Sequence, residues 1–333
     1  MSTVLQRDEA ESVLHPGVLA LDCAAEVARI GERMRETLVR FHRRGVVLGL
    51  SGGVDSSVCA ALAVAALGPE RVVGILMPER ESSESSERLA RLVARQLGLA
   101  EVRVDISAAL EGLGCYAVRD DAIRAVVPAY GPGWKSSIGI SGGMEGQFNR
   151  FDLMVQDPQG RIERVRLPYA QYLAIVAATN YKQRIRKGVE YFHADLHHYA
   201  VIGTPNLLEY DQGFFVKNGD GSADLKPIAH LYKTQVYLLA RHLKLPEEVC
   251  TAIPTTDTYS LPLGQEGFYF ALPYHQLDLA LYAYNKGIAP EVLAEALGIS
   301  TEQAAWVYRD LAAKRRNAQY LHAAPVLMAD TPV

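Results

Sequence analysis

A short apolar run that leads into a loop of small residues constrains this chain more than any other feature. Residues 46–57 read Val-Val-Leu-Gly-Leu-Ser-Gly-Gly-Val-Asp-Ser-Ser, which predicts a strand, a tight loop and the start of a helix. Gly52 and Gly53 have no Cβ and can adopt positive φ, so backbone N–H groups can close around an anion. The helix directs its free N–H groups at the same point. Hydroxyl donors come from Ser51, Ser56 and Ser57. The segment predicts a pyrophosphate site.

Asp55 is the unusual member of this loop. A carboxylate beside phosphates is repelled unless a divalent cation lies between them, so we predict that Asp55 is a Mg²⁺ ligand. The loop lacks both the spacing and the lysine of the GxxxxGK[ST] phosphate loop, which weakens a kinase or GTPase interpretation. The simpler alternative is a plain strand-to-helix turn in which Asp55 is the N-cap.

Strand-like and helix-like segments alternate after this loop. Helices are predicted at residues 23–43, 56–67, 85–97 and 169–195, and strands at 46–50, 71–77, 101–106 and 199–203. This βαβ rhythm is typical of an α/β fold with a doubly wound parallel sheet. Ligands of such sheets bind at the carboxyl ends of the strands, where the loop at 51–55 would lie.

The stretch from residue 131 to 168 interrupts the rhythm. Residues 151–156 and 161–167, joined by Asp-Pro-Gln-Gly, predict a β-hairpin insertion. Ser-Gly-Gly-Met-Glu at 141–145 superficially repeats the phosphate loop. It has no strong apolar run before it and no helix-forming run after it, so we predict a flexible turn.

The bulk composition limits the class of protein. The chain has 333 residues, of which 49% are hydrophobic and 22% charged, and a net charge of −4, which is typical of a soluble globular protein. We find no apolar stretch of membrane-spanning length and no signal-peptide core. The four cysteines are widely spaced without a CxxC pair, which argues against a zinc site or disulfide framework and favours the cytoplasm. The slightly acidic total argues against a nucleic-acid coat protein.

The Ser-Gly-Gly-Val-Asp-Ser run resembles the SGGxDS signature of the PP-loop ATP pyrophosphatases. That family cleaves ATP between the α and β phosphates and transfers AMP to an acceptor. The resemblance implies the adenine nucleotide alpha hydrolase-like fold. We therefore expect an N-terminal helical segment at 1–45, a PP-loop ATP pyrophosphatase domain at 46–260 with the insertion at about 131–168, and a C-terminal helical segment at 261–333.

Several later blocks, in the same order along the chain, resemble NAD synthase within this group. They read Gly-Thr-Pro-Asn-Leu-Leu-Glu at 203–209, Gly-Phe-Phe-Val-Lys-Asn-Gly-Asp-Gly at 213–221 and Tyr-Lys-Thr-Gln-Val at 232–236. The likeness covers about residues 29–256, apart from the insertion. It implies a ligase that adenylates the nicotinate carboxylate of deamido-NAD with ATP and lets ammonia displace AMP.

Chemistry and resemblance together assign roles to individual residues. Glu209 can supply a second carboxylate to the Mg²⁺ held by Asp55, although a helix-cap carboxylate is the simpler alternative. Lys217 and Lys233 place positive charge where pyrophosphate and adenylate develop negative charge, and we predict that they are catalytic together with Asp55. The predicted ATP-binding residues are Gly49, Ser51, Gly52, Gly53, Val54, Asp55, Ser56, Ser57, Met77, Thr204, Lys233 and Thr255. The predicted acceptor-binding residues are Asn180, Arg184, Lys217, Asp220 and Asp224.

The Asn-x-x-x-Arg-x-Arg pattern of the family falls on Asn180, Arg184 and Arg186. The two arginines are two residues apart on a helix, hence about 200° around its axis. They cannot both face one ligand, so one of them belongs to a salt bridge or to a dimer contact.

The likeness weakens toward the C-terminus. The family usually continues Gly-Gln-x-Asp-Glu, whereas Gly264-Gln265 is followed here by Glu-Gly-Phe-Tyr-Phe. Its closing His-Lys-Arg is matched in part by Lys314-Arg315, with Ala313 in place of histidine. These changes fall on parts that shape the acceptor site, so amidation of a different carboxylate by a paralogue is the main alternative.

Two further alternatives belong to other classes. A tRNA-modifying PP-loop enzyme usually needs reactive cysteines and a basic surface. Residues 290–309 imitate a DNA-binding helix-turn-helix with Ser300 as N-cap, but the second helix offers few basic groups to phosphate. We also expect a homodimer by resemblance. We expect no glutaminase domain, so that ammonia arrives free or from a separate glutaminase subunit.

Overall fold

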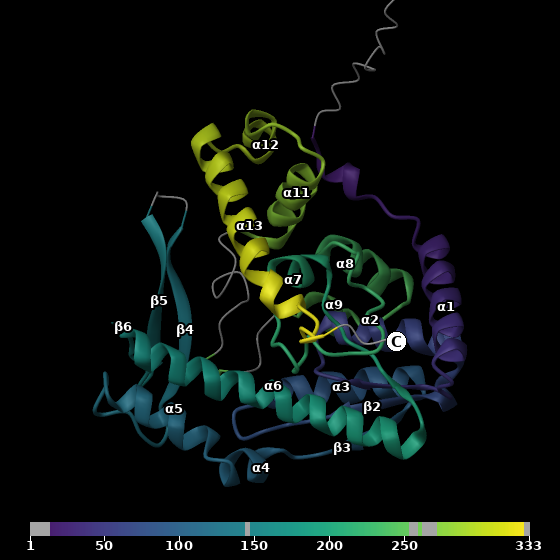
Figure 1. Cartoon of the computed structure of the whole chain (residues 1–333), viewed down its shortest axis with the longest axis horizontal. Coiled ribbons are helices and arrows are strands. Elements are labelled where there is room, and N and C mark those ends of the chain that lie inside the picture. Colours follow the sequence, from purple (N-terminus) through teal and green to yellow (C-terminus); the bar gives the residue numbers. More distant parts are fainter. Residues whose placement is uncertain (1–13, 144–146, 253–258, 262–271, 330–333) are drawn as a thin grey trace, which may run out of the picture.

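A parallel sheet of four strands lies at the centre of the molecule. The computed structural model describes residues 14–143, 147–252, 259–261 and 272–329. The strands are β1 (Val46–Gly49), β2 (Val72–Leu76), β3 (Ala100–Arg103) and β7 (Ala200–Val201), and their order is β3-β2-β1-β7. All three pairings are parallel. The predicted α/β class is therefore confirmed (Figure 1).

Helices cover both faces of this sheet, because successive residues of each buried strand point in opposite directions. Val46 and Leu48 of β1 belong to one core, to which five helices contribute. These are α1 (Cys23–Arg40), α2 (Val54–Leu67), α3 (Glu84–Leu97), α8 (Lys233–His242) and α9 (Glu247–Thr251). Val47 faces a second core with Ala194 of the long helix α6 (Tyr169–His197). The prediction of a doubly wound sheet holds.

The strand order creates a crevice between β1 and β7. From β1 the chain moves outward to β2 and β3, and it then returns through α6 to β7 on the opposite side of β1. Connections on the two sides of such a switch point diverge, which opens a ligand crevice at the carboxyl ends of the two strands. The loop after β1 and the segment after β7 meet there.

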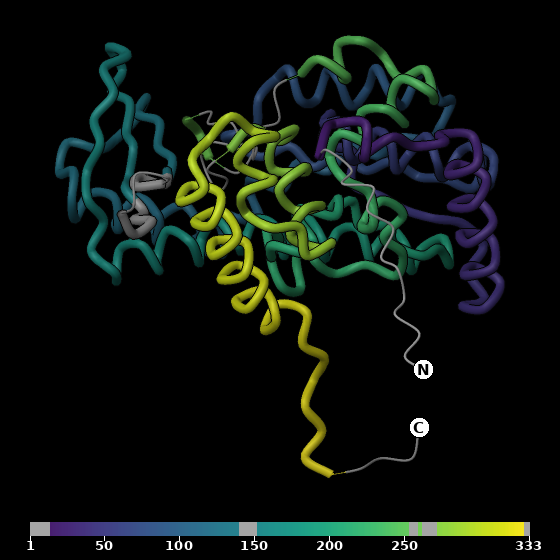
Figure 2. Tube along the Cα trace, turned by 90° about the horizontal axis from the view of Figure 1, so that it is seen from above, coloured from purple at the N-terminus to yellow at the C-terminus, as the bar shows by residue number. Residues whose placement is uncertain are grey.

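The insertion is a three-stranded antiparallel sheet rather than a hairpin alone. Its strands are β4 (Lys135–Gly143), β5 (Gln147–Gln156) and β6 (Ile162–Arg166), in that order. Ile138 and Leu153 pack with Ile175 of α6, so the sheet is attached to the long helix. Figure 2 shows it at the end of the molecule opposite α1.

One prediction about the insertion is wrong. Residues 141–143 do not form a flexible turn, because they continue β4 and pair with β5, with a register shift between Ser141 and Gly143. Strand β4 reads Lys-Ser-Ser-Ile-Gly-Ile-Ser-Gly-Gly, and its two isoleucines are too few for the strand to be recognised from its pattern. Met144 and Glu145 lie outside the described residues.

Two helices lie between β3 and the insertion, and three more follow the α/β core. The first two are α4 (Ser107–Gly112) and α5 (Cys115–Arg124), and α5 packs on α6. The later helices are α11 (Tyr274–Asn285), α12 (Pro290–Leu297) and α13 (Thr301–His322). Ser300 caps α13 through a capping box with Gln303, as the sequence predicts for the cap itself. These helices share a core with Leu208 of α7 (Leu207–Gln212).

The remaining regular segments are two 3₁₀ turns, at Pro16–Leu19 and Pro69–Arg71. Among the described residues, no helix is both long and apolar enough to cross a membrane.

Candidate active site

The loop between β1 and α2 has the conformation that an anion site needs. Gly52 adopts φ +82°, and a Cβ on it would lie 2.3 Å from the carbonyl oxygen of Ser86. Only glycine fits this position. Gly53 has φ −80° and serves as the N-cap of α2, so the expectation that it could take positive φ is not met. Asp55 lies in the first turn and is not the N-cap, which removes the simpler interpretation of this residue.

The loop hydroxyls divide into two groups. The Oγ atoms of Ser51 and Ser56 lie 3.1 Å apart, and both residues line a large cavity. Ser57 is buried and donates its hydroxyl to the carbonyl of Gly53 at 2.8 Å. Among the described residues that line the cavity Ser57 is absent, so the structure does not bring it to the predicted ATP site.

This cavity, of about 1750 Å³, opens at the carboxyl ends of β1, β2 and β7. Most of the predicted ATP-binding residues line it together, although they come from segments far apart in the chain. They are Gly49, Ser51, Gly52, Gly53, Val54, Asp55, Ser56, Met77, Thr204 and Lys233. Thr255 lies outside the described residues, as do residues 264–270.

Asp55, Glu209 and Lys233 meet in this cavity. The ammonium group of Lys233, 1% exposed, forms an ion pair with the Oδ2 atom of Asp55. Burial and the nearby charge of Asp55 raise the pKa of Glu209 to about 8. Burial alone would lower the pKa of Lys233, but the charges of Asp55 and Glu209 outweigh it and raise that pKa. The structure thus brings the two predicted carboxylates and the predicted catalytic lysine into one electrostatic group.

Asn206 connects the two carboxylates. Its side-chain nitrogen donates to Oδ1 of Asp55 at 3.2 Å, and its side-chain oxygen accepts from the backbone of Glu209 at 3.1 Å. The carboxylate of Glu209 in turn accepts from the backbone N–H of Asn206 at 3.2 Å. This is a capping box, so the helix-cap role of Glu209 is real. Its carboxylate nevertheless lines the cavity with Asp55.

Asp278 holds the helix that carries Lys233. Its carboxylate accepts from the backbone N–H groups of Lys233 and Thr234 at 3.3 and 2.7 Å, and from the Thr234 hydroxyl at 2.6 Å. These bonds cap the start of α8 from the separate helix α11. Sequence reasoning missed both Asp278 and Asn206. The Asn-x-x-Glu spacing at 206–209 is the signal that could have revealed Asn206.

The structure does not bring Lys217 into the large cavity. Its ammonium group donates to the carbonyls of Tyr320 and Ala323 at 2.9 and 3.1 Å and lies over the Tyr320 ring. Lys217 therefore caps the C-terminus of α13 and lines a neighbouring cavity of about 240 Å³. This placement does not support the predicted catalytic role of Lys217.

Arg184 lies in the same small cavity, where its Nε donates to the Lys217 carbonyl at 3.2 Å. Arg186 lines the large cavity instead. The two arginines line different cavities, in line with the argument that they cannot both face one ligand, but the selection of Arg184 for the main site is not supported. Helical spacing separates the two side chains without telling which one faces the sheet.

The other predicted acceptor residues also separate. Asn180 lines both cavities. Asp220 lines the large one, where burial raises its pKa although its carboxylate accepts from the Val216 N–H at 2.8 Å. Asp224 instead accepts from the Val201 N–H at 2.7 Å and fixes the end of β7. It is not among the described residues that line the large cavity.

A buried ion pair on α6 was not predicted. Lys187 pairs with Glu190 at 2.5 Å, and both line the large cavity. A Cβ on Gly49 would lie 2.9 Å from the Glu190 carboxylate, so β1 and α6 approach closely here. The three-residue spacing of opposite charges on one helix was the available signal.

Asp55 and Glu209 fit Mg²⁺ by their chemistry. Carboxylate oxygens are the ligands this ion prefers, and phosphate oxygens and water usually complete its shell. Burial and, after it, the neighbouring charge of Asp55 raise the pKa of Glu209, and a bound cation would favour the charged form of both carboxylates. In the part of the chain that the structure describes, no cluster of three or more His, Cys, Asp or Glu residues forms a complete protein cage. The site therefore suits a cation that is shared with phosphates.

Comparisons with known proteins identify the family. A family model described as NAD synthase matches residues 26–126 and 160–318. A curated NH(3)-dependent NAD(+) synthetase of Mesorhizobium japonicum is 55% identical over 315 residues, which cover 94% of this chain and 99% of the relative. One of Rhizobium meliloti is 51% identical over 325 residues, which cover 97% of each chain.

Solved structures share the fold. An NH3-dependent NAD synthetase of Campylobacter jejuni, solved with nitrate, superimposes with a TM-score of 0.62 over 93% of this chain and 100% of that chain, at 21% identity. An NMN synthetase of Francisella tularensis gives a TM-score of 0.59 over 92% and 99% of the two chains, at 18% identity. Residues 127–159, which contain β4 and β5, fall between the two segments that the family model matches.

Proposed function

The chain belongs to the NAD synthase family, and from this premise we infer that it is an ammonia-dependent ligase that converts deamido-NAD into NAD. ATP is cleaved to AMP and pyrophosphate in the reaction. The single observation that supports this function best is the meeting of Asp55, Glu209 and Lys233 in one cavity beside the Ser51–Ser56 loop.

Two nucleophilic displacements account for the chemistry, the first at the α-phosphorus of ATP and the second at the acyl carbon of the adenylate. A carboxylate oxygen of the acceptor attacks the α-phosphorus of ATP, and pyrophosphate leaves with its electron pair. Ammonia then attacks the acyl carbon, loses a proton, and AMP leaves as the amide forms. Protein groups chiefly position the reactants and stabilise developing charge in such reactions.

The chain's own residues suit these tasks. The turn at Gly52 and the start of α2 direct backbone N–H groups toward the phosphates. Lys233 supplies a buried positive charge that Asp278 and the Asp55 carboxylate keep in place. In a site of low polarity such a charge is a strong stabiliser of a departing pyrophosphate. Asn206 fixes the relative position of the two carboxylates.

We propose that Asp55 and Glu209 hold Mg²⁺ together with phosphate oxygens. When bound, the ion would neutralise charge on the departing pyrophosphate. The two carboxylates also explain why Lys233 remains charged in a buried place.

Purified protein tests the function directly. Incubation with ATP, Mg²⁺, ammonium and deamido-NAD should release equal amounts of AMP, pyrophosphate and NAD. Release of AMP only when another carboxylate replaces deamido-NAD would instead identify a paralogue with a different acceptor.

The other classes have little structural support. Burial raises the pKa of Cys59, Cys115 and Cys250, so none of these buried thiols is an activated nucleophile for sulfur transfer. Helix α13 buries Ala304, Val307 and Leu311 in the C-terminal core, so this face cannot enter a DNA groove.

The cellular setting of the enzyme is also part of the proposal. We expect a cytoplasmic homodimer that takes ammonia either free or from a separate glutaminase subunit. The four cysteines are all free thiols, which suits a reducing compartment. Size-exclusion chromatography with light scattering measures the subunit number, and activity with glutamine in place of ammonium would reveal a built-in glutaminase.

A further inference from the structure

The residues described so far occupy one part of the large cavity, and the insertion builds another. Arg80, Arg124, Trp134 and Lys135 line the same cavity as the Ser51–Ser56 loop. Arg80 follows β2, and Trp134 and Lys135 stand at the entry to β4. We call Arg80, Trp134 and Lys135 the insertion-side group.

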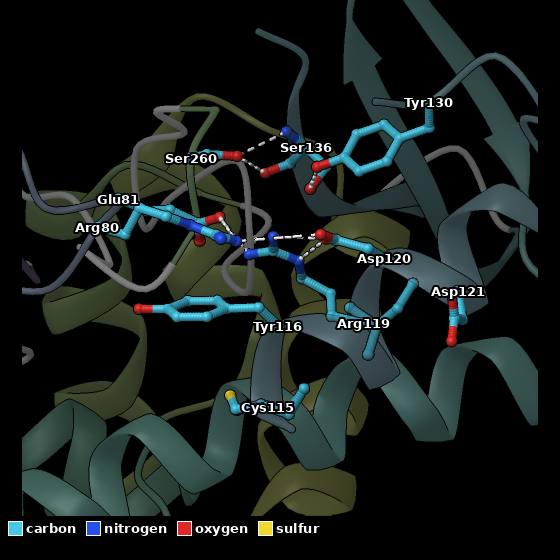
Figure 3. A network of polar contacts seen from close by, with 12 residues as sticks. Arg80, Glu81, Cys115, Tyr116, Arg119, Asp120, Asp121, Tyr130, Ser136 and Ser260 are labelled. Carbon is cyan, nitrogen blue, oxygen red and sulfur yellow. Dashed lines mark hydrogen bonds and ion pairs between the residues drawn. The ribbon is translucent and has the colours of Figure 1, made fainter. Parts of the chain in front are cut away.

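Arg80 is held in place by an aromatic ring and by two long ion pairs, and its side chain is partly exposed. The central carbon of its guanidinium lies over the Tyr116 ring, 3.8 Å from the ring centre (Figure 3). The nearest carboxylates, Glu81 and Asp120, are each 3.9 Å away, beyond hydrogen-bond distance. The side chain is 46% exposed. A stacked guanidinium loses little further freedom when it binds an anion, so this arrangement favours anion recognition.

The carboxylates around Arg80 are already used by other cations. Lys182 contacts Glu79 at 2.9 Å and Glu81 at 2.7 Å. Arg119 pairs with Glu81 and, at 2.6 Å, with Asp120. These buried pairs fix the loop after β2 against α5 and α6. Arg80 makes two longer ion pairs, at 3.9 Å, with Glu81 and Asp120, and its half-exposed guanidinium can also bind an external anion.

Trp134 and Lys135 complete the group from the insertion. Tyr130 packs at an angle beside Trp134, with ring centres 6.0 Å apart. The next residue, Ser136, is fixed by bonds with Ser260 and Leu261 at 2.9 and 3.1 Å. Within the described parts of the chain, the Lys135 side chain makes no hydrogen bond or ion pair. The cavity wall thus presents an aromatic ring beside an available ammonium group.

We propose that the insertion-side group binds the diphosphate and adenosine half of the acceptor dinucleotide, an inference that rests on the proposed function. The reaction brings the triphosphate of ATP and the diphosphate of deamido-NAD into one cavity. The Ser51–Ser56 loop and Lys233 are suited to the triphosphate of ATP. The diphosphate of deamido-NAD needs a second cationic surface, which Arg80 and Lys135 supply. Trp134 offers a face on which its adenine can stack.

Steady-state kinetics of three variants tests the proposal. In Lys135→Gln, Arg80→Gln and Trp134→Ala, KM for deamido-NAD should rise about tenfold, while KM for ATP changes less than about twofold. Arg164→Gln is the matched control, because Arg164 is an exposed arginine of the same sheet outside the cavity lining. It should behave like the wild type. Lys135 is exposed, so its variant should keep the fold even if Arg80→Gln does not.

A truncated acceptor gives a second readout. Nicotinate mononucleotide lacks the adenylate half, so the wild type should prefer deamido-NAD by kcat/KM, and the three variants should lose about tenfold of that preference. An unchanged preference, or a rise in KM for ATP equal to that for deamido-NAD, would overturn the proposal. Failure of the wild type to amidate deamido-NAD would instead overturn the proposed function.

Discussion

The side-chain amide of Asn206 lies 3.2 Å from the carboxylate of Asp55 and at the same time caps the helix that carries Glu209. One residue therefore joins the segment after β1 to the segment after β7. The sheet brings these segments together at its switch point, and Asn206 sets the final distance between the two carboxylates. Asn206 thereby holds Asp55 and Glu209 on the same side of the cavity.

The phosphate loop should tolerate a methyl group at one glycine but not at its neighbour. Gly52→Ala forces positive φ on alanine and a contact with the Ser86 carbonyl, so it should cost about 2–4 kcal/mol of stability and most of the activity. Gly53→Ala, with φ −80° and only the Ser51 hydroxyl nearby, should cost at most about 1 kcal/mol. Denaturant unfolding of both variants checks this. Equal losses would contradict the described loop.

The two roles of Glu209 can be separated. Glutamine can occupy the same capping-box position, so Glu209→Gln should unfold within about 1 kcal/mol of the wild type. Activity should fall about a hundredfold or more, because a neutral amide is a poor Mg²⁺ ligand. Glu209→Ala should lose a further ~1 kcal/mol of stability. High activity in the glutamine variant at saturating Mg²⁺ would restrict Glu209 to its capping role.

The ion pairs of Glu81 with Lys182 and Arg119 should give a pH-dependent contribution to stability. Burial raises the pKa of Glu81, but Lys182 and Arg119 outweigh burial and lower it below 4.5. A carboxyl with a lowered pKa stabilises the fold above its unfolded pKa, and this stabilisation is lost as pH falls through the folded pKa. Glu81→Gln should therefore cost about 3 kcal/mol at pH 7 and progressively less below pH 4.5. Urea unfolding at several pH values measures this difference, with Glu163→Gln on β6 as the exposed control. A difference that does not depend on pH would refute it.

Lys217 should act mainly on the end of α13. Removal of its ammonium group in Lys217→Gln leaves two helix-end carbonyls without that donor, which should cost about 0.5–1 kcal/mol. We expect kcat to change less than about threefold. A hundredfold loss of kcat in a variant of normal stability would instead support the catalytic role that the family resemblance implies.

Features that depend on local pattern could be predicted from the sequence. The apolar run and the spacing of the glycines predict the strand, loop and helix around Asp55. The position of Ser300 before a periodic segment predicts its role as a helix cap. The parallel order of β1 and β7 follows from the βαβ rhythm. The sequence alone therefore predicts that Asp55 and Glu209 lie close together.

Features that depend on distant contacts could not be predicted. Asp278 caps α8 from a helix 44 residues away, and no local pattern marks it. Lys217 matches the family motif by its sequence position. Its loop turns at Asn218, which has φ +60°, and the side chain reaches α13 instead of the large cavity. Strand β4 has two isoleucines among serines and glycines, which is too weak a pattern, so its pairing with β5 identifies it.

The most direct test of the central claim is the rate of pyrophosphate release by Asp55→Asn with ATP, Mg²⁺, ammonium and deamido-NAD. Asparagine keeps the size of the side chain, and Glu209 remains to balance the charge of buried Lys233, so the variant should stay folded. The rate should fall by about 10³-fold or more, because one of two metal carboxylates is lost. Asp195→Asn, an exposed change on α6, should leave the rate unchanged. Turnover by folded Asp55→Asn within about tenfold of the wild type would contradict the shared cation site.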